Sequence, residues 1–280
     1  MAKKASVFKI VIFIILTVAI LVYGFNQIKD RLPRGLVNII APTRLKVMTY
    51  DINHGVGQDN IYSLSRIAKI IRSESPQLVC LNEVDYKTKR GFNDEQVRRI
   101  AADLGMEFTF ARNYTIDGGW TGTAILSKYP IEFAENKVYK QDYGHETKSL
   151  LHIIISAGKN QIHFYGTKLS ADSIASSNQT KELLDFIFEW GSDNPVIIAG
   201  NFNMTPRAKR IHEMAYYYYD VGAYIESEGF TYPAGEPRKR LDYLFSNKFA
   251  TPREVFVLDN EMTRLSSDHL PVVAEFKIDY

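Results

Sequence analysis

The sequence contains one cysteine among 280 residues, which excludes an intramolecular disulfide. That residue, Cys80, lies in the apolar run Leu78–Leu81, so we expect a buried thiol that packs as a small hydrophobic side chain. An excess of one charge is also absent, because 34 Lys and Arg nearly balance 32 Asp and Glu. A net charge of +2 argues against a general nucleic-acid-binding domain, which usually has a strongly basic face. The sequence has no internal repeat and no low-complexity tract.

One long hydrophobic run is present near the N-terminus. Residues 7–25 are apolar except for Lys9 and Thr17, and a run of this length is close to the ~20 residues needed to cross a bilayer. A cleaved signal peptide usually has a shorter apolar region followed by small residues, which Val22–Phe25 do not match. We therefore predict a tail over residues 1–6 and an uncleaved transmembrane signal anchor over 7–25. A cleaved signal and a buried core helix are the alternatives.

Basic residues flank this run on both sides, so the positive-inside rule nearly cancels. They are Lys3, Lys4 and Lys9 on one side and Lys29, Arg31 and Arg34 on the other. A short N-terminus ahead of a single span more often stays in the cytoplasm, which predicts a single-pass protein with its domain on the extracytoplasmic side. Residues 26–43 are predicted to be a linker, and residues 44–280 the folded domain.

Strand patterns outnumber helical patterns about two to one in this domain. Residues 44–50 alternate as in a strand, whereas the apolar residues of 61–71 recur at helical spacing. Helices between only some of the strands exclude a regular βα alternation. We therefore predict an α/β (α+β) fold, a four-layer sandwich of two mostly antiparallel sheets flanked by helices. The other predicted strands are 77–84, 107–112, 122–128, 131–139, 150–156, 160–167, 195–199, 229–232, 240–245, 253–258 and 271–277, and the other helices are 93–104, 176–190 and 206–219.

Polar residues cluster just past the ends of the apolar strands, where ligands are usually held. Taken singly, an Asp or Asn at a strand end is more often a turn former than a ligand. Asp242 is the exception, because a carboxylate between Leu241 and Tyr243 is costly to bury unless it is paired. A histidine partner would meet that need and would fix the tautomer of its ring. The five clusters are Asp51–Gly55, Asn82–Asp85, Gly200–Asn203, Arg240–Phe245 and Ser266–Val272.

In order and spacing, these motifs resemble the endonuclease/exonuclease/phosphatase superfamily. That superfamily includes DNase I-like nucleases, abasic-site endonucleases, neutral sphingomyelinases and inositol-phosphate phosphatases. The resemblance covers about residues 45–279, and it implies a DNase I-like sandwich of two sheets with outer helices, here preceded by one transmembrane helix. The matching segments are Met48–Tyr50, Leu81–Asp85, Gly122–Ser127, Phe230–Pro233, Arg240–Tyr243 and Ser267–Val272.

The resemblance also implies residue roles. Glu83 matches the metal-binding glutamate, a hard ligand suited to Mg²⁺ or Mn²⁺, and Asp268 would stand near the metal or a second cation. His269 would contact the scissile phosphate, with Asp242 orienting its ring. A metal and positioned donors are the expected equipment for phosphoryl transfer. The implied substrate-binding residues are Asn203, Asn53 and His54.

Three positions depart from the family pattern. Asp51 replaces an asparagine, Asn201 replaces the aspartate that orients or deprotonates the attacking water, and Lys168 replaces a histidine of a Thr-His-Leu segment. An amide cannot accept a proton as a general base. The first two changes are reciprocal, however, and in the family these two side chains hydrogen-bond to each other. We therefore hypothesise that Asp51 has taken over the water-orienting or the metal-binding role, which makes Asp51, Lys168, Asn201, Asp242 and His269 the catalytic candidates.

These observations predict a membrane-anchored, divalent-metal-dependent phosphoester hydrolase of phosphodiesterase or phosphatase type. A bilayer anchor favours lipid or other envelope phosphoesters over nucleic acid, and we expect a monomer. The basic residues of 207–210 and 238–240 are predicted to form solvated surface, with a phosphate clamp as the alternative. The alternatives are a catalytically impaired pseudoenzyme that binds a phosphorylated ligand or a protein partner, an extracellular nuclease, and a purely structural role.

Overall fold

The computed structural model describes residues 44–140, 146–157, 160–191, 193–225 and 227–279. The predicted tail, transmembrane anchor and linker over residues 1–43 lie outside the described residues. Within the described part of the chain, no helix is long and apolar enough to cross a membrane.

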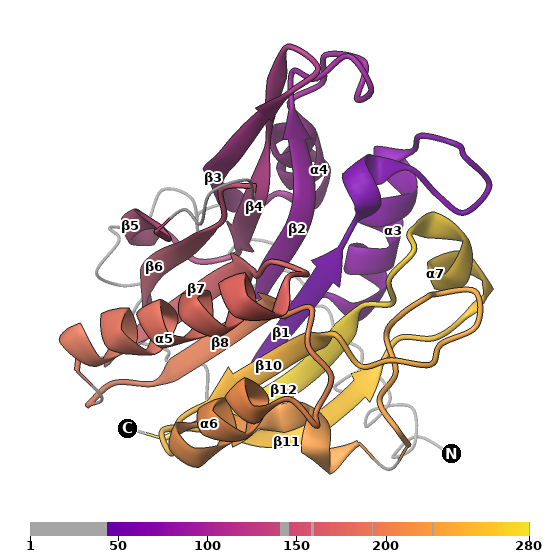
Figure 1. Ribbon diagram of the computed structural model, residues 1–280. Helices are drawn as coiled ribbons and strands as arrows, with labels where there is room; N and C mark the ends of the chain where they lie inside the picture. The colour runs from indigo at the N-terminus through magenta and orange to yellow at the C-terminus, as the bar shows by residue number, and fades with distance from the viewer. Residues whose placement is uncertain (1–43, 141–145, 158–159, 192, 226, 280) are drawn as a thin grey trace, which may run out of the picture. The chain divides into compact units, whose positions relative to one another are not determined.

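Two six-stranded sheets form the centre of the domain (Figure 1). The first sheet has the order β11 (Ala250–Val257), β12 (Val272–Ile278), β1 (Arg44–Asp51), β2 (Leu78–Tyr86), β4 (Gly119–Ser127) and β3 (Glu107–Ile116). The second has the order β5 (Ile131–Val138), β6 (Ser149–Ala157), β7 (Asn160–Lys168), β8 (Val196–Asn201), β10 (Asp242–Ser246) and β9 (Tyr219–Asp220). The pairs β1–β2 and β7–β8 are parallel, and the other neighbours are antiparallel, so both sheets are mixed.

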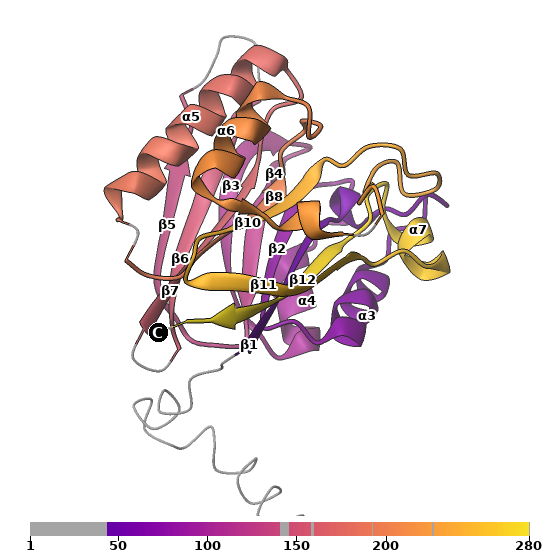
Figure 2. The same cartoon turned by 90° about the horizontal axis from the view of Figure 1, so that it is seen from below.

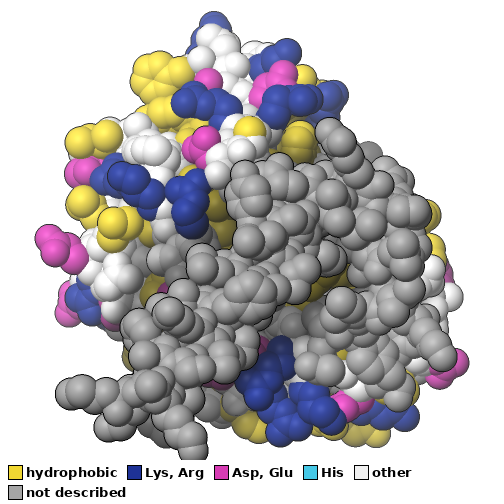
Figure 3. Space-filling model, turned by 180° about the vertical axis from the view of Figure 1, so that it is seen from behind, with side chains coloured by type: hydrophobic (Ala, Val, Ile, Leu, Met, Phe, Trp, Pro, Cys, Tyr) yellow, Lys and Arg dark blue, Asp and Glu magenta, His cyan; other side chains and the backbone are white. Residues whose placement is uncertain are grey.

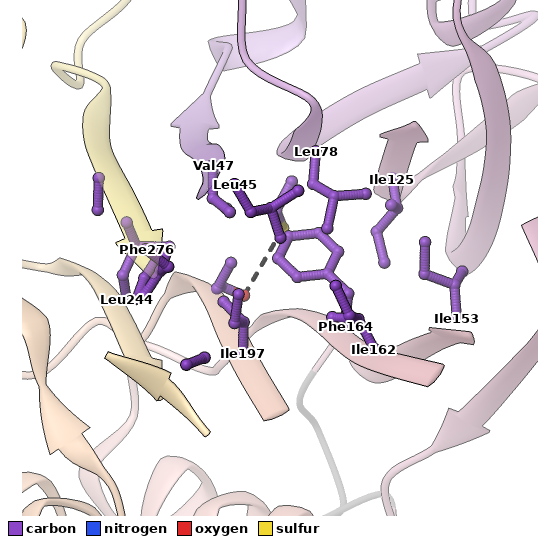
Figure 4. Close-up of a cluster of buried hydrophobic side chains, with 14 of the residues drawn as sticks. Leu45, Val47, Leu78, Ile125, Ile153, Ile162, Phe164, Ile197, Leu244 and Phe276 are labelled. Carbon is purple, nitrogen blue, oxygen red and sulfur yellow. Dashed lines mark hydrogen bonds between the residues drawn. The ribbon is translucent and has the colours of Figure 1, made fainter. Parts of the chain in front are cut away.

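Three hydrophobic clusters separate four layers of structure. The first lies between the two sheets and includes Leu45, Phe164, Ile197 and Phe276 (Figure 4). The second lies under α3 (Leu64–Glu74) and α4 (Gln96–Leu104), which cover the outer face of the first sheet. The third lies under α5 (Ser173–Glu189) and α6 (Lys209–Tyr217) on the other side of the molecule (Figure 2). The predicted sandwich of two sheets flanked by helices is confirmed.

Cys80 belongs to the cluster between the sheets, as expected for a small hydrophobic side chain. It is fully buried on β2, and its thiol donates a hydrogen bond of 3.6 Å to the carbonyl of Ala199 on β8 (Figure 4). Burial raises the pKa of the thiol to about 12, so it stays protonated.

The predicted strand at 229–232 is wrong. Residues 230–233 form a loop in which only Tyr232 makes a bridge, to Lys239, and Gly229 before it has a left-handed φ of 64° that interrupts an extended chain. A short helix that the sequence analysis did not predict, α7 (Glu261–Ser266), begins at a capping box formed by Asn260 and Thr263. The predicted helix at 206–219 ends earlier, at Tyr217, and leads into β9.

His152 and His163 lie side by side on the face of the second sheet that α5 covers. His152 Nε2 is 3.1 Å from His163 Nδ1, and the His152 ring stacks on Tyr165 with centroids 4.2 Å apart. Both histidines are buried, and Trp190 contacts both rings. Burial, together with the neighbouring His163, lowers the pKa of His152 to about 3.

This cluster predicts acid sensitivity of the fold. A histidine whose folded-state pKa is depressed contributes stability that is present above its unfolded pKa of about 6.5 and is lost as pH falls toward 3. We expect the free energy of unfolding to fall by about 2 kcal/mol between pH 6.5 and pH 5 from this residue. Urea unfolding at several pH values checks this, with His152→Phe showing a flatter pH dependence than wild type. Substituting the exposed His212 by Gln should leave the dependence unchanged, and an equally steep curve for His152→Phe would contradict the prediction.

Candidate active site

The site begins where alternation along the inner strands replaces apolar side chains with polar ones. Side chains two residues apart point to the same face of a strand, so the face of β1 that carries Leu45 and Val47 also carries Asp51. On β8 the same rule places Asn201 after Ile197 and Ala199. The corresponding positions of the other inner strands are Asn82 on β2, Lys168 on β7 and Asp242 on β10. The space between the sheets therefore ends in a polar layer at one end of the apolar core.

Asp51 and Asn201 meet across this layer, one from each sheet. The Asn201 amide donates from Nδ2 to Asp51 Oδ2 at 3.0 Å, and its Oδ1 accepts from the backbone N–H of Asn203 at 2.9 Å. Both side chains are fully buried. Asn82 holds the backbone of Asn201 through a further bond of 3.0 Å between Asn82 Oδ1 and the Asn201 N–H. The amide–carboxylate pair predicted from the reciprocal exchange is thus present.

Lys168 places a positive charge between two carboxylates. Its Nζ donates to Asp51 Oδ2 at 2.8 Å and contacts Glu83 Oε1 directly. The lysine side chain is 12% exposed. Burial lowers the pKa of Lys168, but the charges of Asp51 and Glu83 outweigh burial, so its pKa is raised and the ammonium form is favoured.

Glu83 leaves the ladder of β2 at a bulge. The pairing of β2 with β4 shifts between Leu81 and Val84, and Glu83 has a φ of 53°, which is rare for a residue with a side chain. The bulge turns its carboxylate toward Lys168 and His54, whose Nε2 lies 3.1 Å from Glu83 Oε2. Burial raises the pKa of Glu83, but its hydrogen bond to His54 and the charge of Lys168 lower it well below the ordinary value.

His54 stands behind Glu83 and joins it to Asp85. Its Nδ1 lies 3.1 Å from Asp85 Oδ1, and Arg90 donates to Asp85 at 2.7 Å and 2.9 Å. Burial lowers the pKa of His54, but its hydrogen bonds to Asp85 and Glu83 outweigh burial and raise the pKa to about 9. His54 therefore positions Glu83 from behind.

Asp242 and His269 form the buried pair that the sequence predicts. Asp242 Oδ2 lies 2.7 Å from His269 Nδ1 and accepts a second bond of 2.6 Å from the Thr231 hydroxyl. Burial opposes the charge on His269, but Asp242 outweighs it and raises the pKa of His269 to about 9. The ring packs against Tyr232 with centroids 4.8 Å apart, and its Nε2 lies 3.5 Å from Asn201 Nδ2. Asp242 thereby fixes which edge of the imidazole faces the other site residues.

A cavity of about 710 Å³ opens over this layer. The ammonium group of Lys168 and the imidazole of His269 line it, together with the carboxylates of Glu83 and Asp268. Burial, together with the negative charges of Asp51 and Glu83, raises the pKa of Asp268. The remaining lining residues are Glu146, Lys148, Ser170, Ala171, Asp172, Asn203, Thr205, Tyr232, Lys239 and Leu241.

The structure brings most of the predicted residues together but gives three of them other places. The Asn53 amide donates to the Val56 carbonyl at 3.0 Å and stabilises a turn, and neither Asn53 nor His54 lines the cavity. Asp51 is fully buried beneath Lys168, so its carboxylate does not reach a water in the cavity. Asn203 does line the cavity, although its Nδ2 also donates to the Leu169 carbonyl at 2.8 Å.

The sequence analysis assigned no role to several residues that the structure places at the site. Asn82 and Thr231 hold Asn201 and Asp242 in place, and Asn82 could have been found from its inner-face position on β2. Lys148 and Lys239 line the cavity, and Lys239 is exposed there, in agreement with the predicted solvated surface. Its neighbour Arg240 is buried and paired with Asp220, so that part of the surface assignment is wrong.

The carboxylates named for a metal ion do not offer it a free set of oxygens. Both oxygens of Glu83 have donors, Lys168 and His54, and Asp51 Oδ2 has two donors of its own. Among the described residues, no group of three or more His, Cys, Asp or Glu side chains is placed to hold a metal ion. Mg²⁺ usually keeps several waters and binds through one or two carboxylates, so the paired oxygens of Glu83 and Asp51 are what does not fit it here. Asp268, the third carboxylate named for a metal, lines the cavity.

A sequence model described as the Endonuclease/Exonuclease/phosphatase family matches residues 48–269. The uncharacterized protein YbhP of Escherichia coli K12 is 27% identical over 246 residues, which are 83% of this chain and 96% of YbhP.

Solved structures with a similar fold include two with informative names. The human Nocturnin catalytic domain with bound sulfate anion has a TM-score of 0.66 at 20% identity, and the match covers 84% of this chain and 93% of that chain. The mannosyl-6-phosphatase Bt3783 of Bacteroides thetaiotaomicron has a TM-score of 0.67 at 15% identity, covering 83% of this chain and 99% of that chain. These likenesses confirm the DNase I-like fold.

Because Asp51 and Asn201 contact each other from different sheets, we expect the effects of substituting them on the free energy of unfolding to depend on each other. Asp51→Asn removes a buried partner of Lys168 and should destabilise the fold by about 3–5 kcal/mol. Asn201→Asp places two carboxylates in contact and should also destabilise it. The double variant Asp51→Asn/Asn201→Asp restores one amide and one carboxylate, so we expect its loss to be smaller than the sum by at least about 1 kcal/mol.

Urea unfolding of the four proteins measures this coupling. The exposed Asp193 provides a matched control, because Asp193→Asn should change stability by less than about 0.5 kcal/mol. Additive losses from the two single substitutions would show that the pair does not interact as described.

Proposed function

The chain belongs to the endonuclease/exonuclease/phosphatase family, and we propose that it is a phosphoester hydrolase whose reaction takes place in the cavity beside His269. This family and its structural neighbours are generally phosphoester hydrolases. The observation that carries the proposal is the Asp242–His269 pair, which presents an imidazole in a fixed orientation at the wall of a polar cavity.

The reaction needs stabilisation of charge on the phosphoryl oxygens more than it needs covalent chemistry. His269, held by Asp242, donates from Nε2 to one phosphoryl oxygen, and Lys168 donates to another from the same cavity wall. Donors that are already oriented require no reorganisation when charge develops in the transition state. Asn203 and the exposed Lys239 bind the remaining oxygens.

Asp268 is the carboxylate that we propose as the acceptor of the water proton. Asn201 cannot accept a proton, and Asp51 is buried beneath Lys168. Glu83 is held by Lys168 and His54 on its two oxygens. Asp268 lines the cavity next to His269 in the chain and accepts a hydrogen bond of 3.4 Å from the Ser267 hydroxyl. The water oxygen then bonds to phosphorus as its proton moves to Asp268, and the bond between phosphorus and the ester oxygen breaks. The departing oxygen takes a proton from solvent water and leaves as the alcohol, and Asp268 returns its proton to solvent.

The substrate class that this cavity favours is a compact phosphoester. Its size suits a sugar phosphate or a headgroup-sized molecule, and one relative of the same fold is a mannosyl-6-phosphatase. On the face seen in Figure 3, Lys and Arg side chains lie in separate groups among acidic and apolar ones where described residues form the surface. The nearly balanced net charge of +2 supports a small phosphoester over nucleic acid, which requires a track of phosphate contacts.

We further propose that the predicted anchor of residues 7–25 holds this domain at the outer face of a membrane. Arg44 and Asp51 are the two ends of β1, an eight-residue strand about 26 Å long, so the attachment point and the cavity are at opposite ends of that strand. A linker over residues 26–43 could extend at most ~60 Å. Membrane lipids and soluble envelope phosphoesters are therefore both within reach of the cavity.

A second candidate is a protein that binds a phosphorylated ligand without hydrolysing it. The observation that favours it is that both polar atoms of the Asn201 amide are already bonded, and an amide cannot accept the water proton that the aspartate implied by the resemblance would take. The cavity cations serve binding equally well in this account.

Hydrolysis of chromogenic phosphate monoesters and diesters by the full chain tests the proposal. We expect His269→Ala and Asp268→Asn to lower kcat/KM by about 10²–10⁴-fold, because each removes a group that acts on the phosphoryl centre or on water. His212→Ala, which changes an exposed histidine, is the matched control. Equal rates for wild type and His269→Ala would refute the proposed site. A wild type that binds phosphate without turnover, and loses binding in His269→Ala, would establish the second candidate.

A further inference from the structure

We propose that the ammonium group of Lys168 is a built-in cation that stands in place of a divalent metal, so that this cavity binds phosphate groups without a metal ion. The inference rests on the proposed phosphoester site but does not depend on turnover. It concerns the chemistry that receives the phosphate.

The position of the ammonium group is the first observation. Lys168 ends β7 on its inner face, and Nζ reaches one carboxylate on β1 and another on β2. Two strands of the first sheet and one strand of the second therefore converge on a single positive charge. A divalent ion bound by Asp51 and Glu83 would have to occupy the space that Nζ fills.

The state of the carboxylate oxygens is the second observation. Glu83 Oε1 contacts Lys168, and Glu83 Oε2 lies 3.1 Å from His54 Nε2. Asp51 Oδ2 accepts from Lys168 and Asn201, and Asp51 Oδ1 accepts from the Asn53 backbone N–H at 3.3 Å. All four oxygens thus have protein donors. Metal binding would require at least two of these bonds to break, besides the dehydration of Mg²⁺, which is reluctant.

The remaining hydrogen of the ammonium group links this cation to a ligand. A lysine ammonium has three donor hydrogens, and the two carboxylates use two of them. Lys168 also lines the cavity, with His269 in the same lining. The third hydrogen is therefore available to a phosphate oxygen, and the ligand meets one lysine and one histidine where a metal site would offer a metal and a histidine.

The experiment measures binding by the full chain in detergent, with inorganic phosphate, Mg²⁺ and Mn²⁺ as separate ligands. We expect wild type to bind phosphate with the same affinity in EDTA and in millimolar Mn²⁺, and its Tm to be unaffected by either metal alone. A phosphate affinity that rises more than tenfold with metal, a Tm that rises with metal alone, or no phosphate binding under either condition would overturn the inference.

Lys168→Met removes the charge and leaves two carboxylates without their shared cation. We expect this variant to gain a Mn²⁺-dependent rise in Tm of several degrees and to bind phosphate at least tenfold more weakly in EDTA. Lys239→Met is the matched control for the Mn²⁺ response alone, because Lys239 lines the same cavity and is expected to bind phosphate but contacts neither carboxylate. It should gain no rise in Tm with Mn²⁺. A Lys168→Met protein that folds but ignores Mn²⁺ would contradict the assignment. The wild-type titrations decide the question if the variant does not fold.

These outcomes separate the inference from the proposed function. Metal-independent phosphate binding without hydrolysis would remove the hydrolase proposal and keep the built-in cation. Hydrolysis that requires Mg²⁺ would keep the hydrolase proposal and remove the built-in cation.

Discussion

The contact of Lys168 with Asp51 and Glu83 allows carboxylates to be buried in the polar layer of this domain. Carboxylates at the end of an apolar core are costly to bury unless each has a partner, and removing one partner of a buried pair is strongly destabilising. Lys168 neutralises charge from two strands of the other sheet. Asn201 completes the arrangement by donating to Asp51. The two sheets are thus joined at this end by charge and hydrogen bonds, whereas a large hydrophobic cluster lies between them elsewhere.

The same contact divides the site into a buried half and an accessible half. Asp51 and Asn201 are fully buried. Asp51 accepts hydrogen bonds from Lys168 and from the side-chain amide of Asn201, and so fixes the position of both groups. His269 and Asp268 line the cavity and are placed to act on a ligand. The exchange of asparagine and aspartate that we infer between positions 51 and 201 would therefore preserve the internal pairing. We propose that proton transfer then depends on Asp268, while Asp51 has a positioning role.

Sequence reasoning predicted the features that depend on local pattern. The strands that lead to Asp51 and Asn201 were predicted from the alternation over 44–50 and the apolar run over 195–199, and the cost of burying Asp242 predicts a histidine partner, which His269 provides. The contacts of Lys168 could not be predicted in this way, because they depend on how two sheets stack and not on register within one. Glu83 is a similar case, since a bulge and a φ of 53° redirect its side chain. The loop at 230–233 was misread because its aromatic residues suit a strand, while Gly229 and Pro233 do not.

A lysine, in our proposal, provides the cation of this phosphate site. A crystal of the full chain soaked in phosphate and Mn²⁺ provides a direct test, because anomalous scattering locates Mn²⁺ independently of the phosphate. We expect phosphate against Lys168 Nζ and His269 Nε2, with no anomalous peak between Asp51 and Glu83. A Mn²⁺ peak at that position, with Lys168 displaced from both carboxylates, would contradict it.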